Sequence, residues 1–300
     1  MEKKRREFLK IIAAGTSGLI GGSTLASESS SKKDTGSYLG VLVDTVNCIG
    51  CRKCEWACNQ ENQEEKHELA KFESKEVFKT SRRPETDKFT VVNSYDNPKA
   101  PNDESFMKVQ CMHCNEPACV SACIVGALTK SESGAVSYDA WKCIGCRYCM
   151  VACPFQVPAY EYHDVLTPEV KKCTFCNHRI KEGKMPACVE ACPEEALTFG
   201  TRKDLIELAY SRIKKSPDKY YPYIYGEKDI GGTSWMYLTG VNYNKTQLPE
   251  LPEEPIPEIT ESIQHGIFKS FIPPLALYGL LGLIMYSTKG EENSEGGENE

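Results

Sequence analysis

Sixteen cysteines, arranged in four groups, carry the clearest chemistry in this sequence of 300 residues. Two of the groups share the spacing C-x2-C-x2-C-x3-C: the first is Cys48, Cys51, Cys54 and Cys58, and the third is Cys143, Cys146, Cys149 and Cys153. This spacing is the bacterial ferredoxin pattern for a [4Fe–4S] cluster. A tight loop with a cysteine at every third residue can bring three thiolates to one cube, while the fourth cysteine points away toward a neighbouring cluster.

The other two groups vary this pattern. The second is Cys111, Cys114, Cys119 and Cys123, and the fourth is Cys173, Cys176, Cys188 and Cys192. No cysteine is left over, so the sequence predicts four [4Fe–4S] clusters. The segments CIGCRKCEWAC (48–58) and CIGCRYCMVAC (143–153) agree at eight of eleven positions, which indicates an internal duplication of a two-motif unit.

Other uses of so many cysteines fit the spacing less well. Zinc ribbons use two C-x2-C pairs, which would leave the remaining cysteines without a role. Disulfides suit an exported protein, but cysteines three residues apart in a tight loop would have to find partners elsewhere. The net charge of −6 argues against a nucleic-acid partner. Since the sequence shows no nucleophile–base pair, phosphate loop or open metal site, we expect an electron-transfer protein that is not itself an enzyme.

Short elements must carry these loops, and the fold class we expect is α+β. Residues 38–45 (YLGVLVDT) read as a strand that leads into the first group, and residues 106–109 and 135–139 as short strands before the second and third. The run from Thr201 to Asp204 resembles a capping box before a helix that continues through Ile213. Residues 59–105 are a charged insertion, either a partner-docking element or a solvated loop.

Three side chains beside the predicted ligands each have two interpretations. His113 lies between Cys111 and Cys114, where it either tunes a cluster or faces solvent. Arg52 and Arg147 follow a cysteine at matching places in the duplicated loops. Each arginine either raises the potential of a cluster through its charge or pairs with a carboxylate.

The N-terminus reads as an export signal over residues 1–26. Arg5-Arg6-Glu7-Phe8-Leu9-Lys10 resembles the twin-arginine signal, with Lys4 at a place where Ser or Thr is more usual. The alternatives are a basic amphipathic helix and a disordered start. Clusters are assembled from reduced thiols, so a chain that folds before export avoids oxidation of its cysteines. We therefore expect the protein at the periplasmic face of the cytoplasmic membrane, with residues 27–37 as a linker.

The C-terminus contains an apolar segment, residues 267–287, that predicts a transmembrane anchor. Its 21 residues would span about 31 Å as a helix, against about 30 Å of hydrocarbon in a bilayer. The alternative is a buried core helix. Residues 247–266 begin with a Pro- and Glu-rich stretch and form a stiff spacer before the anchor, and residues 288–300 are an acidic tail.

The cysteine groups resemble the four-cluster electron-transfer subunits of the dimethyl-sulfoxide-reductase type. This resemblance covers residues 39–200 and implies a region of two ferredoxin-like dicluster modules at 38–200, followed by an extension at 201–246. Further segments are similar to the periplasmic electron-transfer subunits of the hydrogenase-2 type. They are CRYCMVACPFQVPAYEY (146–162), YPYIYGEK (221–228), LTGVNY (238–243) and IQHGIFK (263–269).

The resemblance implies how the cysteines are shared among the clusters, because in the family group one nests with group four and group two with group three. The implied sets are Cys48, Cys51, Cys54 with Cys192; Cys173, Cys176, Cys188 with Cys58; Cys111, Cys114, Cys119 with Cys153; and Cys143, Cys146, Cys149 with Cys123. Spacing alone supports the exchange of fourth cysteines but not the choice of partner group. Asn59 and Ile124 stand where proline is the ferredoxin norm, which alters the turn and removes no ligand.

The resemblance also implies partners. They are the catalytic subunits of a nickel–iron hydrogenase on one side and a polytopic quinone-binding membrane subunit on the other. The alternative is the electron-transfer subunit of a formate dehydrogenase or another molybdopterin oxidoreductase.

Overall fold

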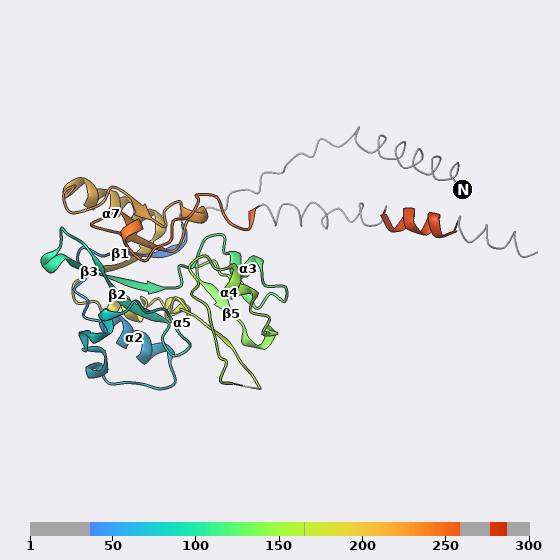
Figure 1. The fold of residues 1–300 in the computed structure, drawn as a ribbon, viewed down its shortest axis with the longest axis horizontal. Coiled ribbons are helices and arrows are strands. Elements are labelled where there is room, and N and C mark those ends of the chain that lie inside the picture. Colours follow the sequence, from blue (N-terminus) through green and yellow to red (C-terminus); the bar gives the residue numbers. More distant parts are fainter. Residues whose placement is uncertain (1–36, 165, 259–276, 287–300) are drawn as a thin grey trace, which may run out of the picture. The chain divides into compact units, whose positions relative to one another are not determined.

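A four-stranded sheet organises the folded body of the protein (Figure 1). The structure is a computed structural model that describes residues 37–164, 166–258 and 277–286. The strand order is β8-β1-β10-β9, built from β8 (Leu197–Thr201), β1 (Leu39–Asp44), β10 (Trp235–Leu238) and β9 (Ile224–Tyr225). β1 runs antiparallel to β8 and parallel to β10, with Val41 opposite Trp235. Residues 201–246 therefore complete the sheet that β1 begins.

The strand predicted at 38–45 is confirmed as β1. Its apolar run is buried on both faces, as expected for a central strand whose neighbours cover both sides. On one face Leu42 packs with Leu205 and Ala209 of the helix α7 (Arg202–Lys215). On the other face Val41 and Val43 belong to a core that also contains cysteines of several groups. The sheet thus holds α7 on one side and the cysteine loops on the other.

The helix predicted after Thr201 is also confirmed. The Thr201 hydroxyl caps it by accepting a hydrogen bond from the Asp204 amide at 3.3 Å. Such a cap satisfies one of the donors that the first turn of a helix leaves free. The helix continues to Lys215, one half-turn beyond the predicted Ile213, and its last turn is basic, which suits the negative end of the helix dipole.

The remaining strands form three two-stranded ribbons, and short helices lie between them. The ribbons are β2 (Thr90–Asp96) with β3 (Glu104–Gln110), β4 (Leu128–Lys130) with β5 (Val136–Tyr138), and β6 (Ala159–Tyr160) with β7 (Val170–Lys171). The helices are α2 (Lys53–Asn62), α3 (Ala118–Ser121), α4 (Tyr148–Ala152), α5 (Asn177–Lys181) and α6 (Ala187–Glu190). The strands predicted at 106–109 and 135–139 are confirmed as β3 and β5, and the fold mixes helices and strands as predicted.

The charged insertion at 59–105 is more than a solvated loop. It contributes β2, whose partner β3 leads into the second cysteine group. Phe72 and Phe89 from this insertion are buried. Because it packs against the body, the insertion forms part of the wall around the first cysteine group. Partner docking by its exposed side remains a prediction.

The two ends of the chain fall largely outside the described residues. The predicted export signal at 1–26 lies there, as do residues 27–36 of the linker. Of the predicted anchor at 267–287, only residues 277–286 are described, and they are helical. Over the described ranges, no helix combines the length and the apolar character needed to cross a membrane.

Candidate metal centres

The first C-x2-C step of each cysteine group shares one backbone feature. The residue before the second cysteine has a positive φ in each loop: Gly50, His113, Gly145 and Phe175. This left-handed residue tightens the loop and turns amides toward the first sulfur. The amides of Gly145 and Phe175 each donate to a cysteine Sγ at 3.4 Å. Such N–H···S bonds are among the means by which proteins set cluster potentials.

Only two of these four positions have the glycine that a left-handed conformation favours. At Gly50 a Cβ atom would lie 2.7 Å from the ring of Phe106, so glycine is required for space as well. His113 and Phe175 adopt the same conformation at a cost of roughly 1–2 kcal/mol each. Their side chains are fully buried and pack against each other, with ring centroids 5.0 Å apart and the ring planes tilted by 44°. Packing therefore holds the strained loops in place.

The first set of cysteines lines one cavity, which we call site A: Cys48, Cys51, Cys54 and Cys192. Three of these residues come from the first group and one from the fourth, 138 positions after Cys54 in the chain. Ile49, Val92 and Pro193 form apolar parts of the wall. Burial raises the pKa of Cys48 to about 11, and the nearby Cys192 and Cys51 thiols add to the shift. Burial in this cavity therefore disfavours the thiolate form of Cys48.

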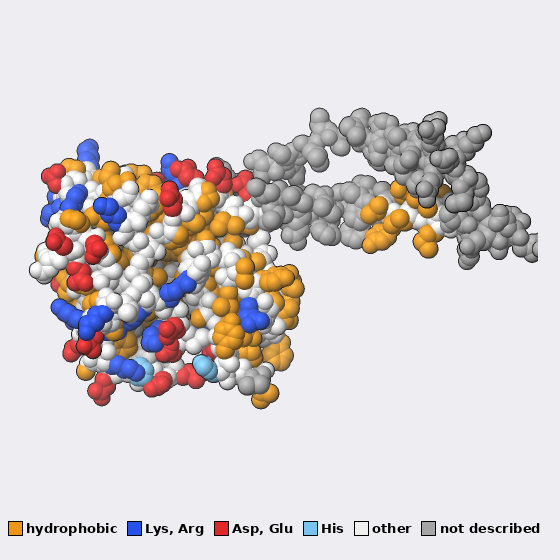
Figure 2. Space-filling model, in the orientation of Figure 1, with side chains coloured by type: hydrophobic (Ala, Val, Ile, Leu, Met, Phe, Trp, Pro, Cys, Tyr) orange, Lys and Arg blue, Asp and Glu red, His pale blue; other side chains and the backbone are white. Residues whose placement is uncertain are grey.

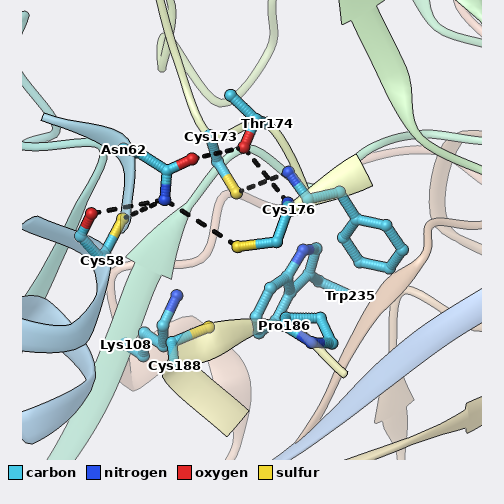
Figure 3. Close-up of a pocket in the computed structure, with 10 residues that line it drawn as sticks. Cys58, Asn62, Lys108, Cys173, Thr174, Cys176, Pro186, Cys188 and Trp235 are labelled. Carbon is cyan, nitrogen blue, oxygen red and sulfur yellow. Dashed lines mark hydrogen bonds between the residues drawn. The ribbon is translucent and has the colours of Figure 1, made fainter. Parts of the chain in front are cut away.

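A second cavity gathers what we call site B: Cys58, Cys173, Cys176 and Cys188 (Figure 3). Asn62 donates from its amide nitrogen to the sulfurs of Cys58 and Cys176, at 3.7 and 3.8 Å. Its amide oxygen accepts a hydrogen bond from Thr174 at 2.7 Å, which fixes the orientation of the donor. Site B thus has a side-chain donor placed between two sulfurs.

The third set, site C, consists of Cys111, Cys114, Cys119 and Cys153. Burial raises the pKa of Cys114 well above its usual value, and the neighbouring thiols that add to the shift are Cys111, Cys153 and Cys119. Cys111 is packed with Cys153 in one small core. The second cysteine group therefore meets the last cysteine of the third.

The fourth set, site D, consists of Cys123, Cys143, Cys146 and Cys149. Burial raises the pKa of Cys149 to about 11, with contributions from the nearby Cys143, Cys146 and Cys123. Cys123 also accepts a hydrogen bond from the amide of Ala127 at 3.2 Å. Cys146 is exposed, in contrast to the cysteines of site B, and lies among exposed apolar side chains.

The four sites follow one another in space. The thiol of Cys54 in site A is close enough to Cys188 in site B for their charges to interact. Cys173 of site B is in the same small core as Cys111 of site C. Cys119 of site C shares another core with Cys149 of site D. The order A–B–C–D is therefore continuous, with A and D at its ends.

The donor set fits iron–sulfur clusters. Each site brings four cysteines together, and the cysteines of sites A and B each line a cavity. Backbone amides donate to the sulfurs of Cys143, Cys173 and Cys123. Burial raises the pKa of at least one thiol in every site. Throughout the described ranges, no three or more His, Cys, Asp or Glu residues converge where a single metal ion could be held. The four cysteines of a [4Fe–4S] cluster would each bind a different iron, so they need not converge on one point.

Three lysines lie near these sulfurs, and no local sequence pattern indicates their position: Lys108 and Lys172 are buried, and Lys130 is half-buried. Lysine is almost never fully buried without a compensating charge. Lys130 donates to the carbonyl of His113 at 2.8 Å, and Lys172 to the carbonyl of Cys173 at 3.2 Å. His113 is fully buried, so the interpretation that it faces solvent is wrong. Its Nδ1 accepts a hydrogen bond from the Val136 amide.

The two matched arginines have different surroundings. Arg52 is buried and forms an ion pair with Glu55 at 2.8 Å, and Arg82 pairs with the same carboxylate at 2.6 Å. Burial works to raise the pKa of Glu55, but hydrogen bonds from Arg52 and Arg82 outweigh it and the pKa is lowered. Arg147 instead lies over the rings of Tyr160 and Tyr162, 5.6 and 5.7 Å from their centroids. The carboxylate-pairing alternative is thus correct for Arg52.

We expect Glu55→Gln to destabilise the wall of site A. The change leaves the buried guanidinium group of Arg52 and the half-buried one of Arg82 without a carboxylate. Breaking a buried pair in this way costs about 3–5 kcal/mol. The Glu55 carboxylate also accepts from the Val92 amide, so the β2 strand should loosen with it. Hydrogen exchange of residues 72–96 should therefore accelerate, and chemical denaturation should shift to lower denaturant. Glu61→Gln is the matched control, because Glu61 pairs with Arg179 in a more exposed place. Equal stability of both variants would contradict the expectation.

The comparisons with known proteins agree with this geometry. The 4Fe-4S dicluster domain family matches residues 103–202. A protein of Nitratidesulfovibrio vulgaris is 48% identical over 264 residues, which cover 85% of this chain and 70% of that protein. Hydrogenase-2 operon protein HybA of Escherichia coli O157:H7 is 36% identical, with 99% of each chain covered. The iron-sulfur subunit of the nitrate-inducible formate dehydrogenase of Escherichia coli is 31% identical over 85% of this chain and 86% of its own length.

Proposed function

Because the chain belongs to the family of iron–sulfur electron-transfer subunits that includes HybA and the formate dehydrogenase iron–sulfur subunits, we propose that it carries electrons between a periplasmic nickel–iron hydrogenase and a quinone-reactive membrane subunit. The observation that carries the choice of partner is the extent of the match to HybA, which covers 99% of both chains. The matches to formate dehydrogenase subunits cover 79–85% of this chain at lower identity. A formate dehydrogenase or another molybdopterin enzyme is the alternative partner.

Four [4Fe–4S] clusters are the cofactors, and we assign one to each of sites A, B, C and D. The gathering of four sulfurs at each site supports this assignment, as does the nesting of the cysteine groups into two dicluster modules, A with B and C with D. When bound, a cluster supplies one-electron redox chemistry. The chain's own residues keep water out, fix the sulfurs and donate hydrogen bonds to them.

The role proposed for the chain is conduction without catalysis. All sixteen cysteines belong to the four sites, which leaves no cluster with an open position for a substrate. Electrons would enter at one end of the A–B–C–D order and leave at the other. Which end faces which partner follows from the surfaces of the end sites.

Site D offers a surface suited to a neighbouring subunit. Trp141 is 96% exposed and Val151 is 86% exposed, and Ile144 and Tyr148 lie exposed beside the same loop. Hydrophobic side chains gather over the part of the body formed by α3, α4 and β5 (Figure 2). Contiguous exposed apolar patches mark interaction sites. We propose that the membrane subunit covers this patch, and that the hydrogenase approaches the opposite end, at site A.

The location we propose is the periplasmic face of the cytoplasmic membrane. The twin-arginine pattern at the N-terminus supports export in the folded state. The apolar run at 267–287 supports a C-terminal anchor, since its length matches the hydrocarbon core of a bilayer. An anchor would keep the electron-transfer body next to a quinone-reactive partner.

The test is anaerobic purification of the native complex from membranes in mild detergent, followed by mass spectrometry. We expect a nickel-containing subunit and a polytopic membrane protein to accompany the chain, and hydrogen to reduce its clusters. A molybdopterin subunit in place of the nickel protein would replace the hydrogenase assignment by the alternative. Recovery in the soluble fraction without extraction would overturn the anchor.

A further inference from the structure

Lys108 stands between the two cavities of the A–B module. It is a residue of β3, and its side chain lines both the cavity of site A and the cavity of site B. Only 2% of the residue is exposed. Figure 3 shows the ammonium group beside Cys188 at the edge of site B. One buried cation therefore faces two sets of four sulfurs.

The surroundings of Lys108 offer no carboxylate. Among the residues that the structure describes, no ion pair joins Lys108 to an Asp or Glu. The nearby Glu55 is already paired with Arg52 and Arg82. The ammonium donates instead to the amide oxygen of Gln110 at 3.0 Å. A buried charge without an opposite charge is costly, so the compensating charge must come from the sulfurs.

The electrostatics of the ammonium agree with this. Burial alone would lower the pKa of Lys108, but thiolates of both sites outweigh it and the pKa is raised. The thiolates concerned are Cys188, Cys173 and Cys58 of site B and Cys54 of site A. The geometry agrees with this direction, because Lys108 lines both cavities and the cysteines of both sites surround its side chain.

Neighbouring side chains hold the ammonium in place. Gln110, its acceptor, donates to the Tyr237 hydroxyl at 2.7 Å, and that hydroxyl donates to the carbonyl of Lys108 at 2.9 Å. The ring of Trp235 lies 4.3 Å from the ammonium nitrogen, a cation–π distance. Strands β3 and β10 thus fix the cation on both sides, and its distance to each site is set by the fold.

We propose that Lys108 is a shared counter-cation of sites A and B that sets the reduction potentials of their two clusters together. The inference rests on the proposed function, because it requires a cluster in each site. Reduction adds one electron to a cluster and so adds one negative charge. A fixed cation stabilises the reduced form of each cluster, and it also lowers the repulsion between two reduced clusters. Lys108 acts through the clusters and is a positioning residue.

The test is a redox titration of the purified full chain, or of its native complex, monitored by electron paramagnetic resonance. The variant is Lys108→Met, which keeps the length and apolar stem of the side chain and removes the charge. We expect two of the four clusters to become harder to reduce, each by at least about tenfold in its equilibrium constant, which is 59 mV for a one-electron couple. Lys108→Arg should keep both potentials near those of the wild type, because it keeps the charge.

Lys130→Met is the matched control. Lys130 is half-buried, and the thiols near it, Cys114, Cys111 and Cys119, all belong to site C. Its removal should leave the two potentials affected by Lys108→Met unchanged. Iron content and the number of paramagnetic signals separate the possible failures. A chain without four clusters would refute the proposed function. If Lys108→Met keeps four clusters, three outcomes would refute the role of Lys108 and leave the proposed function intact. They are unshifted potentials, a shift in only one cluster, and an equal shift in all four.

Discussion

Cys192→Ala should remove the same cluster as Cys48→Ala and a different cluster from Cys188→Ala. Cys192 and Cys188 lie in one sequence motif, yet the structure places Cys192 at site A and Cys188 at site B. A cysteine ligand that is replaced by alanine leaves its cube with three thiolates. The expected result is the loss of about one cluster's iron from each variant, with the same missing paramagnetic signal in the first two variants.

The measurement is iron content per chain together with electron paramagnetic resonance at controlled potential. Cys58→Ala is the counterpart from the other side, because Cys58 belongs to the first sequence group but lines site B. It should therefore resemble Cys188→Ala. If Cys192→Ala and Cys188→Ala lose the same signal, each sequence motif holds its own cluster and the nested assignment is incorrect.

Removal of iron and sulfide should unfold the cysteine-bearing half of the body while part of the sheet persists. Cysteines are members of the small cores around α2, α6 and the loops of sites B and C. Without clusters, burial raises the thiol pKa values, to about 12 for both Cys119 and Cys173, and the loops retain strained left-handed residues. Metal binding that shapes a site contributes folding free energy, about 10–16 kcal/mol for structural zinc in small fingers.

Hydrogen exchange before and after anaerobic chelation measures this effect. Residues 48–62 and 173–192 should exchange at nearly the rate of an unfolded chain after chelation. The segment from β8 through α7 should keep measurable protection, because Leu42, Leu205 and Met236 form a core without cysteine. Uniform protection in the chelated protein would contradict the expected dependence on clusters.

Local pattern was enough to predict several elements, and long-range contacts explain the others. β1 and α7 have a continuous apolar run and a side-chain cap, both of which are readable within a few residues. β10 was not predicted, because the strand has only four residues. It forms by pairing with β1, which is far away in the sequence. The same holds for the burial of Lys108, which is compensated by sulfurs from separate motifs.

For the candidate sites, too, local spacing predicts some features, and long-range packing creates the others. The spacing of the cysteines predicts cubes and the exchange of fourth cysteines, since these are properties of a single loop. Spacing does not choose the partner group, and there the resemblance to a family supplied the sets that the structure brings together. Asn62 was missed because its amide reaches sulfurs of two groups, and only the packing of α2 on the fourth group creates that position.

The parallel pairing of β1 with β10 sets the order of events during synthesis. Val41 and Trp235 are partners across a separation of 194 residues, and all sixteen cysteines lie between them. Contacts of such high sequence separation form late, because a long loop must close before they contribute. The central strand pair can close only after the last cysteine group has left the ribosome. Until then this part of the sheet cannot cover the cysteine groups, so their thiols are accessible while the chain is still incomplete.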